Sequence, residues 1–175
     1  MAAMYVRLAI RIVHNASLSL YARIDIKPIK EKYVALFNPS RDEVRQFFCG
    51  AWQKLLTGGV LTPLEMIACS WIKLHPEYHA ILSNNEALVQ EFTPEQGQTN
   101  PFLHLSMHLS ISEQISIDQP PGIKLVAEQL SRKLDSEHEA QHQIMECLGR
   151  ALWEAQRNGQ ALDALAYIDS IRKLL

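Results

Sequence analysis

The sequence of 175 residues lacks the features that mark several large functional classes. No apolar run approaches the roughly 18 residues that a membrane-spanning helix needs. No glycine-rich phosphate loop and no G-x-S-x-G motif occurs, so the usual sequence signs of nucleotide binding and serine hydrolysis are missing. The formal charge of −2 argues against a dedicated nucleic-acid binder, because such proteins normally carry a basic face.

Cysteine is scarce as well. Cys49, Cys69 and Cys147 are far apart, odd in number and without a C-x-x-C motif. This pattern disfavours both a disulfide framework and a redox pair, and it predicts three buried thiols in a cytoplasmic protein. Cys147 lies about one helical turn from His142, which is compatible with a Cys-His nucleophile, but a structural thiol is the simpler interpretation.

Histidine, by contrast, follows a pattern. Six of the seven histidines form pairs with a spacing of four: His75/His79, His104/His108 and His138/His142. Chance predicts about 0.3 such pairs in a chain of this length and histidine content. Residues four apart lie on the same face of a helix, where two imidazoles can bind one metal ion.

The pairs therefore predict a histidine-lined site that holds a divalent metal such as zinc, iron or manganese. The candidate carboxylate ligands are Glu146, Glu113 and Glu77. The pair His75/His79 is the weakest, because Pro76 interrupts a helix between its members.

Two other interpretations compete with the metal site. In the first, the histidines are structural, and the protein is an adaptor whose exposed groove binds a partner protein. In the second, HEAQH at residues 138–142 is the H-E-x-x-H motif of a metallohydrolase. Against the hydrolase, Glu139 is expected in a capping box with Ser136. Met145 and Leu148 also stand where one protease class has glycine and its third histidine.

Helix signals are dense after residue 35. Serine, threonine, asparagine and aspartate precede apolar segments, and Gly or Pro follows them. They predict an all-α protein, an irregular bundle of about five to six helices in a single domain at 36–175. The preceding residues, 1–35, read as a basic N-terminal extension that is either a short β-hairpin or disordered. Trp52, Trp71 and Trp153 are expected in the core.

The segment 103–111 alternates strictly between apolar and polar residues, which is typical of a strand. We nevertheless predict a helix, because Asn100-Pro101 is a helix start. His104 and His108 then border an apolar face, with the serines and Glu113 opposite. In the last long helix, His138 and His142 also border the core stripe, so the two pairs are predicted to face each other across one helix–helix contact.

From Leu36 to the C-terminus the chain resembles a known bacterial family. The resemblance rests on residues 37–40, 75–79, 100–109, 118–123, His138 with His142, and residues 145–149 through 155–159. The family is catalogued as domain of unknown function 1841. The resemblance implies a cytoplasmic bacterial protein and supplies no activity. Members of that family begin at a methionine in place of Leu36, so we expect residues 1–35 to be an upstream reading of the same frame.

Overall fold

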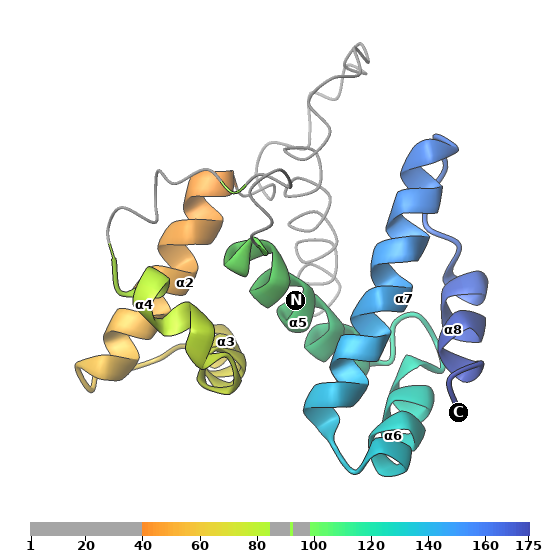
Figure 1. Ribbon diagram of the computed structural model, residues 1–175, viewed down its shortest axis with the longest axis horizontal. Coiled ribbons are helices and arrows are strands. Elements are labelled where there is room, and N and C mark those ends of the chain that lie inside the picture. The colour runs from red at the N-terminus through yellow and green to blue at the C-terminus, as the bar shows by residue number, and fades with distance from the viewer. Residues whose placement is uncertain (1–39, 85–91, 93–98) are drawn as a thin grey trace. The chain divides into compact units, whose positions relative to one another are not determined.

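The computed structural model describes residues 40–84, 92 and 99–175, and it contains only helices in these residues. They are α2 (Arg41–Leu56), α3 (Pro63–Leu74), the 3-10 helix η1 (Pro76–Tyr78), α4 (His79–Leu82), α5 (Pro101–Ile117), α6 (Ile123–Leu134), α7 (Glu137–Arg157) and α8 (Ala164–Arg172) (Figure 1). The predicted all-α class is confirmed. The predicted extension at 1–35 lies outside the described residues. Within the described residues, none of the helices combines the length and hydrophobicity that crossing a bilayer requires.

Side-chain caps set where the helices begin. Ser40 and Glu43 form a complete capping box at the start of α2. Thr62 and Glu65 form another at the start of α3. At α7 only half of the predicted box is present: the Ser136 hydroxyl accepts from the Glu139 amide at 3.1 Å, without a reciprocal bond from the carboxylate. The sequence argument that the Glu139 side chain is engaged in capping is therefore not supported.

The described residues form two compact units, which are considered separately. Among the described residues, the N-terminal unit ends at Leu109 and the C-terminal unit comprises Ser110–Leu175. Helix α5 crosses the division, with Pro101–Leu109 in the first unit and the remainder in the second. The single domain expected at 36–175 stays a prediction.

The N-terminal unit packs α2 against α3 and α4. Its core is built from apolar and aromatic side chains: Phe48, Trp52, Ala68, Trp71, Ile72, Leu82, Phe92, Phe102, Leu105 and Leu109. The expected burial of Trp52 and Trp71 is correct. Arg45 is also buried, with its guanidinium 5.6 Å from the centre of the Phe92 ring and 5.3 Å from that of Phe102. Such cation–π contacts partly offset the cost of removing an arginine from water.

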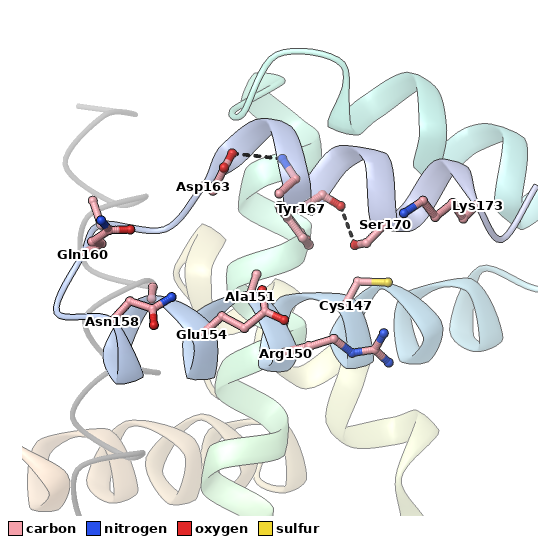
Figure 2. A pocket seen from close by; sticks show the side chains of 13 residues that line it. Cys147, Arg150, Ala151, Glu154, Asn158, Gln160, Asp163, Tyr167, Ser170 and Lys173 are labelled. Atoms are coloured by element: carbon pink, nitrogen blue, oxygen red, sulfur yellow. Dashed lines mark hydrogen bonds between the residues drawn. The ribbon is translucent and has the colours of Figure 1, made fainter.

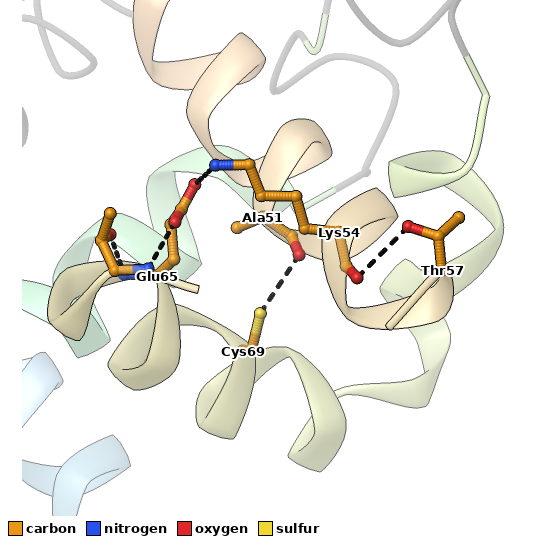
Figure 3. Close-up of polar contacts among 6 residues, drawn as sticks. Ala51, Lys54, Thr57, Glu65 and Cys69 are labelled. Atoms are coloured by element: carbon orange, nitrogen blue, oxygen red, sulfur yellow. Dashed lines mark hydrogen bonds and ion pairs between the residues drawn. The ribbon is translucent and has the colours of Figure 1, made fainter. Parts of the chain in front are cut away.

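Polar contacts hold the end of α2 to α3 (Figure 3). The Lys54 ammonium lies 2.6 Å from the Glu65 carboxylate, and the Cys69 thiol donates to the carbonyl of Ala51 at 3.4 Å. The hydrogen bond from Lys54 and that from the Thr62 amide lower the pKa of Glu65 to about 2. Cys69 is buried as predicted, whereas Cys49 is only half-buried.

In the C-terminal unit α6, α7 and α8 pack against one another. Ile123, Leu130, Ile144, Leu148 and Ile171 are all at most 2% exposed. Trp153 does not belong to this core, because it is 45% exposed and Arg157 covers its ring from 5.2 Å. The predicted core position of Trp153 is wrong because its side chain lies on the outer face of α7.

The polar face predicted for α5 is also wrong. Ser106 and Ser110 are 1% exposed. The Ser106 hydroxyl donates to the Phe102 carbonyl at 2.6 Å, and Ser110 accepts from the Gln114 amide at 3.3 Å. The Tyr167 hydroxyl donates to the Gln114 carbonyl oxygen at 3.2 Å. A serine hydroxyl can be buried at low cost when it has a hydrogen-bond partner four residues away on the same helix. The side of α5 that carries Ser106 and Ser110 is therefore buried and not exposed to solvent.

Candidate metal centre

The local sequence places His75 at the end of α3. Its amide donates to the Ile72 carbonyl at 3.0 Å, and Pro76 then starts η1. Proline cannot continue the α3 hydrogen-bond ladder, so the chain turns at this point. The Tyr78 amide closes the turn by donating to the His75 carbonyl at 3.0 Å. The His75 side chain is 3% exposed.

His104 and His108 lie one turn apart on α5, as predicted. Their Nε2 atoms are 3.2 Å apart, and the Nε2 atom of His75 is 3.0 Å from that of His108. His108 is fully buried and His104 is half-buried. We call His75, His104 and His108 the three-histidine centre. Each offers a ring nitrogen, and these nitrogens lie within 4.8 Å of one another.

Aromatic rings surround this centre. Trp71 stacks on His108 with centroids 4.3 Å apart and an interplanar angle of 11°. Tyr78 stacks on His75 at 5.3 Å and meets the ring of His104 edge-on at 5.6 Å. Burial, aided by the charge of Glu77, raises the pKa of Tyr78 to about 12, so its phenol is neutral. The rings limit how far each imidazole can rotate.

Glu77 contacts the outer side of His75. Its Oε1 atom lies 2.9 Å from Nδ1, the ring nitrogen that points away from the centre. The carboxylate is 55% exposed. Burial is the largest influence and raises the pKa of Glu77, but the hydrogen bond with His75, a backbone hydrogen bond and the nearby His75 and His104 together bring the pKa below its usual value. Glu77 therefore carries a negative charge at neutral pH.

His79 is directed elsewhere. Its Nε2 atom donates to the Ile72 carbonyl at 2.8 Å, and its ring stacks on Trp52 with centroids 4.3 Å apart. The carbonyls in the last turn of a helix have no partner within that helix, so this hydrogen bond caps α3. The two members of the first predicted pair thus have different environments, because Pro76 changes the direction of the chain between them.

In the C-terminal unit the third pair is on α7. The rings of His138 and His142 have centroids 4.3 Å apart. With Glu139 they form a group whose ligand atoms lie within 4.8 Å of one another. Glu146 is exposed on α7 and Glu113 is half-buried on α5. Neither carboxylate belongs to the ligand groups found among the described residues.

The geometry of the three-histidine centre suits a cation better than protons. A neutral imidazole nitrogen carries either one proton or one in-plane lone pair. The Nε2 atom of His108 has two Nε2 neighbours, and one proton or one lone pair cannot be directed well at both. Nitrogen ligands about 2.0–2.1 Å from one ion are roughly 2.8–3.4 Å apart for octahedral to tetrahedral angles. The observed 3.0 and 3.2 Å separations lie in this range.

The sequence patterns did not predict any cleft. A cleft of about 390 Å³ lies between α7 and α8 (Figure 2). Ala151, Ala155 and Ala166 leave the space, Cys147 and Arg150 line one side, and none of the predicted metal ligands faces it. Its lining residues all fall within 147–173, on α7, on α8 or next to these helices, and the packing of the two helices brings them together.

Comparison with known proteins identifies a family but no activity. The family model described as domain of unknown function (DUF1841) matches residues 40–173. No curated protein and no solved structure matches the chain significantly.

Proposed function

We propose that this chain, which belongs to the domain of unknown function 1841 family, binds a divalent metal ion at the three-histidine centre. The approach of two Nε2 atoms, those of His75 and His104, to the Nε2 atom of His108 at 3.0 and 3.2 Å carries the proposal. Two imidazoles on one helix are common without a ligand, but here a third ring nitrogen, from the residue that ends α3, lies 3.0 Å from Nε2 of His108. Both of these histidines are buried. A cation satisfies all three lone pairs at once.

The donor set favours some metals over others. Neutral imidazoles suit zinc and iron, whereas manganese prefers carboxylate and carbonyl oxygens. Of the three metals predicted from the sequence, we therefore expect zinc or iron(II) to bind more tightly than manganese. Three protein ligands leave at least one coordination position for water or another donor.

The experiment is metal analysis of the purified full chain, followed by calorimetric titration of the chelated protein with zinc. We expect about one zinc ion per protein chain in the wild type. In His104→Ala we expect a strong loss of zinc affinity. The matched control is His79→Ala. It also removes an imidazole, but His79 is not part of the three-histidine centre, because its ring bonds to the Ile72 carbonyl. Absence of zinc uptake by the wild-type protein would return us to the adaptor interpretation.

The sequence also predicts His138 and His142 as ligands, and this part is tested separately. Double replacement of His138 and His142 with alanine should reduce the zinc stoichiometry or affinity if they ligate. Unchanged binding in this variant, with binding lost in His104→Ala, would restrict the site to the N-terminal unit.

A further inference from the structure

Each position of the motif HPEYH has a distinct place in the structure. His75 contributes Nε2 to the three-histidine centre, and Pro76 starts the turn. Tyr78 stacks on the ring of His75, and His79 caps α3. Glu77 contacts only the outer ring nitrogen of His75 among the contacts described for its carboxylate, which separates it from the ligand role that the sequence suggested.

The hydrogen bond between Glu77 and His75 has a chemical consequence. A carboxylate can only accept, so the 2.9 Å contact requires a proton on Nδ1 of His75. In a neutral imidazole the other nitrogen, Nε2, then has no proton and presents its lone pair. That lone pair points at His108, towards the position proposed for the ion.

We propose that Glu77 is the positioning residue of this centre: it fixes the Nδ1–H tautomer of His75 and so makes Nε2 a metal ligand. The proposal rests on the proposed function for the ligation step, but the tautomer itself does not depend on metal. Carboxylates in this outer position orient the ring and increase the basicity of the ligand, and their loss typically lowers metal affinity 10- to 100-fold.

The turn explains why Glu77 can do this with an exposed side chain. The Tyr78 amide bonds to the His75 carbonyl, so residues 75–78 form one closed turn. The carboxylate reaches the ring two residues before it without crossing other elements. Tyr78 covers the face of the same ring and limits its tilt, and the Glu77 contact favours the ring orientation in which Nδ1 faces outward.

The test combines a tautomer measurement with zinc titration of the full chain. In the metal-free protein at pH 8, ¹⁵N NMR of the histidine rings should show the proton of His75 on Nδ1, and Glu77→Ala should shift it to a mixture with Nε2–H. Zinc affinity should fall 10- to 100-fold in Glu77→Ala. Glu77→Gln, whose amide oxygen still accepts, should keep the tautomer and lose less affinity. The control Glu128→Gln removes the same charge from an exposed position on α6 and should change neither.

Two results would overturn the inference. One is a His75 ring whose proton is on Nε2 in the metal-free wild type. The other is a Glu77→Ala protein that binds zinc within a factor of about three of a wild type that binds it stoichiometrically. A wild type that binds no zinc overturns the proposed function and the ligation step with it, and the tautomer measurement alone then decides whether Glu77 sets the ring.

Discussion

Separate replacement of His104 and of His79 by alanine should have different effects. The first should weaken zinc binding, and the second should lower the stability of the metal-free fold. Zinc that binds only the native state adds RT ln(1 + [L]/Kd) to the free energy of unfolding, which is about 2.7 kcal/mol at 100 times Kd. For a chain of this length 1 kcal/mol corresponds to roughly 2–4 °C, so zinc should raise the Tm of the wild type by about 5–11 °C.

His104→Ala removes one of three donors from a half-buried position. If its Kd for zinc rises about 100-fold, the same zinc concentration adds only about 0.4 kcal/mol, or roughly 1–2 °C. His79→Ala loses a hydrogen bond of 2.8 Å and a ring stack at 4.3 Å. These contribute about 2 kcal/mol together, so the metal-free Tm should fall by roughly 4–8 °C.

The assay is differential scanning calorimetry of three proteins, each with chelator and with excess zinc. We expect the zinc-dependent rise to persist in His79→Ala and to vanish almost entirely in His104→Ala. The reverse outcome, with the rise retained in His104→Ala and lost in His79→Ala, would refute the division of roles. Equal loss in both variants would contradict the placing of His79 outside the metal site.

The other predictions concern carboxylates and one buried hydroxyl. The lowered pKa of Glu65 stabilises the fold above pH 4.5, and this stability is lost as pH falls towards about 2; Glu65→Gln should therefore flatten the acid limb of a pH–stability curve measured by urea unfolding. Burial raises the pKa of Glu113 to about 7, so the native state retains a proton that the unfolded chain releases near 4.5, and stability falls as pH rises between these values. Glu113→Gln should then be more stable than the wild type at pH 8, by on the order of 1 kcal/mol after allowance for solvent, with no such gain at pH 4. Tyr167→Phe leaves the buried Gln114 carbonyl oxygen without its donor and should cost about 1–3 kcal/mol, read as a lower urea midpoint at an unchanged slope.

Most helix boundaries could be predicted because their signals are local. Ser40, Thr62 and Asp163 cap helices through hydroxyl or carboxylate oxygens that lie within three residues of the amides they accept from. The same holds for the helical state of residues 103–111, where Asn100 accepts from the amides of Phe102 and Leu103 and outweighs the alternating pattern.

The composition of the three-histidine centre could be predicted only in part. Spacing alone identified His104 and His108, because both lie on one regular helix. It also paired His75 with His79, although Pro76 marked this pair as the weakest, and the two rings have different partners. The approach of His75 to His108 depends on how α3 packs near α5, and Trp71 forms part of that contact. Tertiary packing of this kind leaves no periodic trace in a sequence.

The three histidines of the centre are separated by very unequal numbers of residues in the chain. His104 and His108 are neighbours on one helix, so an ion could first bind to both in a short helical segment. His75 is 29 residues before His104, and folding presents it as a third donor at high effective concentration rather than as a separate encounter. A peptide containing only α5 would therefore retain two donors but little affinity, and the gain of the whole chain over that peptide would measure how firmly α3 and α5 are held together.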